Sequence, residues 1–142
     1  MELAGFHVTG APSNVRFVRA RVREACAGLG LAPGRLDALE AAVAEATTNA
    51  IEHGNAGDAS RFVGIRVWAT EETLVVRVTD EGRGGRPPVD PEPPDLDAKL
   101  RGEQSPRGWG LFLMRNLVDA LHVSTRDQHN VVELVVQLQP RR

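Results

Sequence analysis

Two polar side chains four residues apart, Glu45 and Asn49, are the first candidates for chemistry in this chain. They lie in residues 35–52, where apolar residues such as Leu39 and Val43 recur at three- and four-residue steps, which predicts a helix. Glu45 and Asn49 then share a second face, roughly 100–140° around the helix from the apolar stripe. A carboxamide oxygen suits Mg²⁺, and a carboxylate one turn away can act as a general base. The alternative is that both are ordinary solvated helix residues.

A second candidate, Asp80, ends a predicted strand at residues 73–80 and is followed by glycines, in the stretch VTDEGRGG. Side chains alternate along a strand, so Asp80 continues a row of apolar residues and points into the protein. A buried carboxylate needs hydrogen-bond donors. Loop amides can supply them, or the exocyclic amino group of a bound base can, with Gly82 and Gly84 leaving room for its ring. Strand geometry alone leaves both alternatives open.

A third candidate is the stretch RGWGLFLM, in which Gly108 and Gly110 open a predicted helix. The N-terminus of a helix has unpaired amides and a positive dipole end, which together attract anions. Glycine permits close approach of a phosphate, and Arg107 beside it can pair with a phosphate oxygen. The alternative is an ordinary glycine-rich helix start.

The remaining pattern predicts the elements that position these residues. We expect strands at 3–9, 61–69, 73–80, 122–126 and 131–138, a hairpin turn at DQHN, and helices from Ser13 or Asn14 to about Gly28, at 35–52 and at 108–121. Six of the nine prolines lie between Gly82 and Gly108, which predicts a functional lid or a disordered segment. The fold class is α/β: an α+β two-layer sandwich with helices on one face of a mixed, mostly antiparallel sheet, in one domain spanning 1–142.

Composition narrows the classes of function. The net charge of −2 gives no electrostatic reason to bind nucleic acid or an anionic membrane. The single cysteine, Cys26, excludes an intrachain disulfide and a thiolate zinc cluster, and its helical spacing predicts a small core residue. No apolar run reaches the roughly 18 residues of a membrane span, and the start does not resemble a signal peptide, so we expect a cytoplasmic protein.

Taken together and in order, the motifs EATTN, DEGRGG, a proline-rich lid and GWGL resemble the GHKL (Bergerat-type) ATP-binding family. Within it, AVAEATTNAIEHG is similar to the small bacterial anti-sigma-factor serine kinases. The resemblance covers nearly the whole chain. It implies a Bergerat-type, histidine-kinase-like ATPase fold with ATP and Mg²⁺ as cofactors. It also implies a sigma factor and a STAS-type anti-anti-sigma protein as partners, phosphorylation of the latter on serine, and a homodimer.

The resemblance also implies roles for individual residues. Asn49 would coordinate Mg²⁺, Glu45 would be the general base, and Asp80 would bind the adenine amino group with Gly82 and Gly84 making room. Helix amides at Gly108, Gly110 and Leu111 would face the phosphates, under a lid at 85–107. His53 is included among the nucleotide-binding residues, although a partly positive imidazole is also favoured at a helix C-terminus without any ligand.

Two departures from the family pattern leave alternatives open. Pro106 stands where such kinases can carry a phosphate-contacting arginine, and either Arg107 or Arg101 can replace it. The proline-rich lid puts its closing motion in question, so a second hypothesis is a nucleotide-gated module that sequesters a partner without transferring phosphate. We do not expect one half of a larger ATPase machine, because no second domain follows QLQPRR.

Overall fold

A computed structural model describes residues 1–87 and 106–138 of the chain. Its centre is a five-stranded sheet in the order β1-β2-β3-β5-β4. The strands are β1 (Glu2–Thr9), β2 (Phe62–Ala69), β3 (Thr73–Thr79), β4 (Ala120–Arg126) and β5 (His129–Gln137). Every pairing in this sheet is antiparallel, so the parallel part of the predicted mixed sheet is not found among the described residues.

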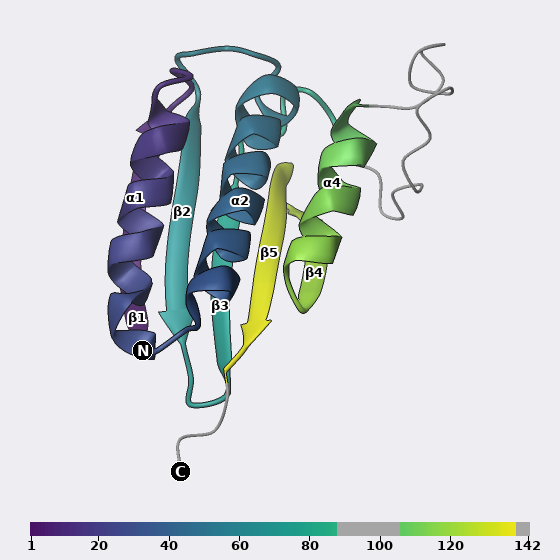
Figure 1. Ribbon diagram of the computed structural model, residues 1–142. Coiled ribbons are helices and arrows are strands. Elements are labelled where there is room, and N and C mark those ends of the chain that lie inside the picture. Colours follow the sequence, from purple (N-terminus) through teal and green to yellow (C-terminus); the bar gives the residue numbers. More distant parts are fainter. Residues whose placement is uncertain (88–105, 139–142) are drawn as a thin grey trace.

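The helices lie side by side on one face of the sheet (Figure 1), which confirms the predicted two-layer arrangement. They are α1 (Asn14–Cys26), the short η1 (Ala27–Leu29), α2 (Pro33–Asn49), the π-helical turn η2 (Ala50–Gly54) and α4 (Pro106–Leu117). None of the helices in the described ranges is long and apolar enough to cross a membrane.

The core lies between the two layers. Val76 and Val78 of β3 pack toward Leu39 and Val43 of α2, and all four side chains are buried, as the sequence periodicity predicts. Burial of an aliphatic side chain of this kind contributes roughly 1.5–3 kcal/mol. Cys26 also belongs to this core, and burial raises the pKa of its thiol to about 11, which confirms it as a small core residue.

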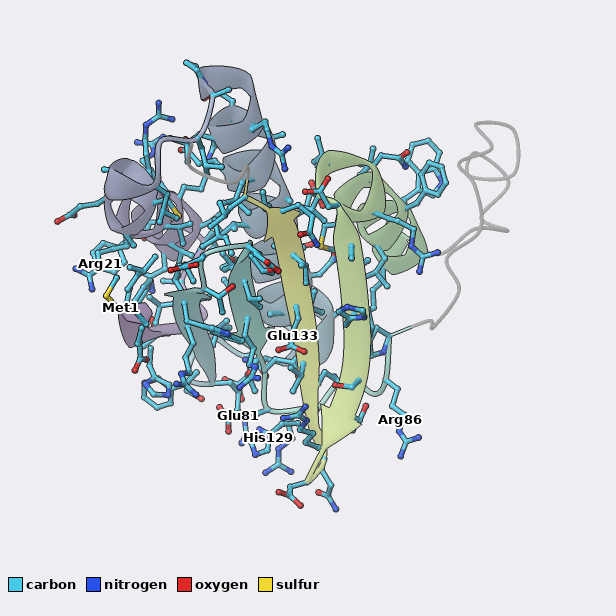
Figure 2. The ribbon with its side chains drawn as sticks, turned by 90° about the horizontal axis from the view of Figure 1, so that it is seen from below. Met1, Arg21, Glu81, Arg86, His129 and Glu133 are labelled. Atoms are coloured by element: carbon cyan, nitrogen blue, oxygen red, sulfur yellow. The ribbon has the colours of Figure 1, made fainter. Side chains whose placement is uncertain are left out.

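The opposite face of the sheet carries no helix among the described residues. Figure 2 shows Glu81, His129 and Glu133 pointing away from the helical layer. On this face the Arg77 guanidinium lies 4.8 Å from the centre of the Trp68 ring and donates to Glu133 at 3.0 and 3.1 Å. The alternation along β3 therefore separates Glu81, on the open face, from Asp80, on the helical side.

Two predicted helix ends differ from those observed. Ser13 takes the N-cap position of α1 but makes no capping hydrogen bond, and Asn14 Nδ2 donates to the carbonyl and the hydroxyl of Thr9. The predicted helix at 35–52 becomes α-helical only to Asn49 and then widens, with the amide of Asn55 donating to the carbonyl of Ala50.

The third helix and the last hairpin are also shifted from their predicted positions. α4 begins at Pro106 and ends at Leu117, so Leu121, predicted as helical, belongs to β4. The hairpin turn is shorter than DQHN: Asp127 and Gln128 have positive φ of 50° and 70°, and β5 already begins at His129. Two central residues with φ > 0 give the backbone twist that a tight hairpin needs.

Candidate nucleotide site

Glu45 and Asn49 do share one face of α2, and that face is turned toward Gly110 of α4. A β-carbon at Gly110 would lie 2.6 Å from Asn49 Nδ2 and 3.1 Å from Glu45 Oε2. Asn49 is only 8% exposed, so it is not a solvated helix residue, whereas Glu45 is partly exposed. The Asn49 Nδ2 atom is buried and has no hydrogen-bond partner among the described residues, which is rare for a buried amide.

Small residues explain how α4 comes so close to α2. The predicted small face of α2 carries Ala38 and Ala42; Ala42 is fully buried, and Ala38 lines a cavity together with Leu117 of α4. These small side chains therefore allow α4 itself to pack closely against α2. Gly110 continues this contact at the other end, beside Asn49.

α4 begins earlier than the sequence predicts, and this changes the expected role of its two glycines. The helix begins at Pro106, two residues before Gly108. The α-helical pattern pairs the Gly110 amide with the Pro106 carbonyl and the Leu111 amide with the Arg107 carbonyl. In this conformation Gly110 provides space beside Asn49, and Leu111 is buried in the core. That amides of Gly108, Gly110 and Leu111 contact phosphates stays a prediction.

The Asp80 carboxylate points into the protein, as the strand alternation predicts, and is 4% exposed. Its Oδ1 atom accepts hydrogen bonds from the Gly82 amide at 2.7 Å and from Asn130 Nδ2 at 3.0 Å. Its Oδ2 atom lies against Gly54, where any β-carbon would overlap with it, and has no donor among the described residues. Burial raises the pKa of Asp80, and its hydrogen bonds and the nearby Arg107 charge oppose that shift. Among the described residues, protein groups thus satisfy Oδ1 and not Oδ2, and a contact of Oδ2 with a bound base stays a prediction.

The glycines after Asp80 have an immediate structural reason. Gly82 has φ of 72°, and a β-carbon there would overlap with the Gln128 carbonyl. A β-carbon at Gly84 would overlap with the carbonyl of His53, whose side chain is half-buried. The protein's own backbone therefore requires these glycines, and their role in making room for a base stays a prediction.

Arg107 lies at the Asp80 end of the site. It is 8% exposed, and its guanidinium donates to the Gly85 carbonyl at 3.1 Å. Burial lowers the pKa of Arg107, and the negative charge of Asp80 opposes that shift. The rival candidate Arg101 and most of the predicted lid at 85–107 lie outside the described residues. A phosphate contact by Arg107 stays a prediction.

Two asparagines that the motif search missed hold this end together. Asn130, 2% exposed, donates to Asp80 and to the Gly85 carbonyl. Asn55, fully buried, donates to the Phe62 carbonyl and accepts from the Glu81 amide. Both follow turn-forming stretches, so the sequence predicts ordinary loop residues. Only the structure, in which their polar side chains are buried, shows that they support the site.

The residues present fit a magnesium–triphosphate group. The Asn49 carboxamide offers a hard oxygen ligand for the metal, and its Nδ2 atom, which has no partner among the described residues, offers a donor for a phosphate oxygen. Within residues 1–87 and 106–138 no group of three or more His, Cys, Asp or Glu could hold a metal. Mg²⁺ takes few protein ligands and completes its shell with water and phosphate oxygens.

Comparisons of the sequence with known proteins identify its family. Residues 8–136 match the family described as the histidine kinase-like ATPase domain. The chain is 30% identical over 126 residues to the anti-sigma F factor of Anoxybacillus flavithermus, covering 88% of this chain and 85% of that one. It is 31% identical over 120 residues to the serine-protein kinase RsbW of Bacillus subtilis, covering 82% and 74%.

Solved structures share the fold at lower identity. The SiaB–SiaC complex of Pseudomonas aeruginosa matches with a TM-score of 0.66 and 16% identity, over 95% of this chain and 89% of that chain. The RsbU and RsbW domains of Rv1364c from Mycobacterium tuberculosis match with a TM-score of 0.64 and 23% identity, over 98% of this chain. This chain spans only 34% of the mycobacterial one. The chain belongs to the histidine kinase-like (GHKL) ATPase family, in the group of the anti-sigma-factor serine kinases.

Proposed function

We propose that this protein is an ATP- and Mg²⁺-dependent serine/threonine protein kinase that acts as an anti-sigma factor. One observation carries the proposal: Glu45 and the buried, unpartnered amide of Asn49 face the same point beside Gly110. An orphaned donor costs about 1–3 kcal/mol, so its retention is expected where a ligand completes its hydrogen bonding.

Each group has a distinct task in this proposal. Mg²⁺ neutralises charge on the triphosphate when it is bound. Asn49 binds the metal–phosphate group, and Asp80 accepts a hydrogen bond from the base through Oδ2. Glu45 accepts the proton from a serine hydroxyl as that oxygen attacks the terminal phosphorus, and the bond from this phosphorus to the bridging oxygen breaks so that ADP leaves. Such a site works by positioning and by charge stabilisation, as phosphoryl transfer requires.

The partners follow from the names of the relatives, an anti-sigma F factor and a serine-protein kinase. We infer that the protein sequesters a sigma factor and phosphorylates a STAS-type anti-anti-sigma antagonist on serine. We also propose that it acts as a homodimer. Light scattering with and without the two partners measures these assemblies directly.

The Glu45→Gln variant tests the kinase activity. With ATP, Mg²⁺ and the antagonist, the wild type is expected to produce phosphoserine, and the variant to lose about 10²–10⁴-fold in rate while it keeps its affinity for ATP. Glu52→Gln, an exposed position on η2, is the matched control and should keep full activity. Nucleotide binding without phosphoserine in the wild type would instead support the sequestering module.

A further inference from the structure

Asn130 joins the candidate base-recognition acid to the backbone at the start of the proline-rich segment. Its single Nδ2 group donates both hydrogens, one to Asp80 Oδ1 at 3.0 Å and one to the Gly85 carbonyl at 2.8 Å. Both acceptors lack a proton at these atoms, which fixes the nitrogen end of the amide toward them. Thr125 Oγ1, 3.4 Å from Asn130 Oδ1, contacts the other end.

The backbone of Asn130 holds the same acid a second time. The Asp80 amide donates to the Asn130 carbonyl at 3.0 Å, next to the β3–β5 pair Thr79 and Val131. Asp80 is therefore fixed at its main chain and at one carboxylate oxygen by one residue. The ring of His129, with Nδ1 2.9 Å from the Asp80 carbonyl, adds a further contact from the open face.

This double attachment decides which carboxylate oxygen is available. Oδ1 already accepts from Asn130 and Gly82, whereas Oδ2 has no donor among the described residues. Rotation about the carboxylate bond would exchange the two oxygens, and the Asn130 hydrogen bond opposes it. A buried acceptor held in one place favours a ligand that donates there and rejects one that presents a second acceptor.

We propose that Asn130 is a positioning residue that orients Asp80 for a purine with an amino group and against a purine with an oxo group at that position. The inference rests on the proposed nucleotide site and adds to it a residue that sets base specificity. Asn130 acts through Asp80 and is not itself assigned a contact with the base.

The test compares two nucleotides rather than one affinity. ATP and inosine triphosphate differ in the amino or oxo group of the base, so their ratio of dissociation constants, measured by calorimetry with Mg²⁺, reports base discrimination. We expect Asn130→Leu, similar in size but without a donor, to lower the preference for ATP about tenfold, the contribution of one hydrogen bond to a charged group. A general loss of folded structure would weaken the binding of both nucleotides equally and leave the ratio of their dissociation constants unchanged.

The matched control is Asn116→Leu, an exposed asparagine of α4 whose Nδ2 donates to the Phe112 carbonyl. It should keep the wild-type ratio. Should Asn130→Leu not fold, Asn130→Ser, which keeps one donor, should give an intermediate ratio. An unchanged ratio in a folded Asn130 variant overturns the positioning role while the nucleotide site stands. Failure of the wild type to bind either nucleotide overturns both.

Discussion

Gly54 and the Asp80 carboxylate are in direct contact, because a β-carbon at position 54 would overlap with Asp80 Oδ2. Gly54 ends the π-helical turn η2, and Asp80 follows β3. The turn after α2 therefore packs against the proposed base-recognition acid, although the two positions lie 26 apart in the sequence. The wider turn brings a residue without a side chain to that point, and single π-helical turns are frequent at functional sites.

Gly54→Ala should therefore displace the Asp80 carboxylate. We expect a loss of about 1–3 kcal/mol in the free energy of unfolding, as overpacking of a core causes, together with weaker ATP binding. Urea denaturation and calorimetry measure the two effects. Gly34→Ala in α2 is the matched control: nothing lies within 4 Å of its β-carbon, so it should be neutral or stabilise by up to ~1 kcal/mol. Equal stabilities of the two variants would contradict the contact.

The burial of Asp80 predicts a dependence of stability on pH. Burial, the largest cause, raises the pKa of Asp80 above the value of 3.8 for an exposed aspartate. A carboxyl with a raised folded-state pKa contributes stability that is present below the unfolded pKa and is lost as the pH rises through the folded pKa. Wild type should therefore lose stability relative to Asp80→Asn as the pH rises from about 3.5 toward neutrality.

Urea unfolding of the wild type and of Asp80→Asn across that pH range measures the difference between their free energies of unfolding. Titratable groups that both proteins share contribute equally and cancel in this difference. Arg107 stays charged across this range, but it attracts residue 80 only when that residue is an ionised aspartate, so this attraction grows as the pH rises and is part of the net shift of the Asp80 pKa. If the wild type instead gains stability relative to Asp80→Asn as the pH rises, the hydrogen bonds to Asp80 lower its pKa by more than burial raises it. ATP binding should be weak in Asp80→Asn at neutral pH.

Local periodicity was sufficient to predict much of the site from sequence. The spacing of Leu39 and Val43 placed Glu45 and Asn49 on a separate face, and alternation along β3 turned Asp80 inward. These features depend on residues close in the chain, whose directions follow from helix and strand geometry alone. Their positions relative to one another came only from the family resemblance.

Contacts between distant segments were not predictable in this way. The carbonyl of His53 requires glycine at position 84, and the side chain of Asn49 requires glycine at position 110. The neighbouring sequence therefore explains neither glycine. Asn130 stands in a stretch typical of turns, yet pairing with Thr125 of β4 makes it a strand residue, and its carbonyl and side chain contact Asp80. Tertiary contacts of this kind override local propensity.

The unpartnered amide of Asn49 predicts opposite effects on stability and on binding. Asn49→Leu replaces a buried donor that has no acceptor with an apolar side chain of similar size. Removal of that desolvation cost should stabilise the nucleotide-free protein by about 1–3 kcal/mol. The same change removes the proposed ligand of the metal–phosphate group, so added ATP and Mg²⁺ should no longer raise the melting temperature.

Asn55→Leu is the matched control for this prediction. Asn55 is equally buried, but its amide donates to the Phe62 carbonyl at 3.0 Å and accepts from the Glu81 amide at 2.6 Å. Its replacement leaves two buried backbone groups without partners and should destabilise the protein by a similar amount. Thermal unfolding of both variants with and without ATP and Mg²⁺ separates the cases. If Asn49→Leu destabilises the nucleotide-free protein as Asn55→Leu does, the Asn49 amide serves the fold, and the observation that carries the proposed function is lost.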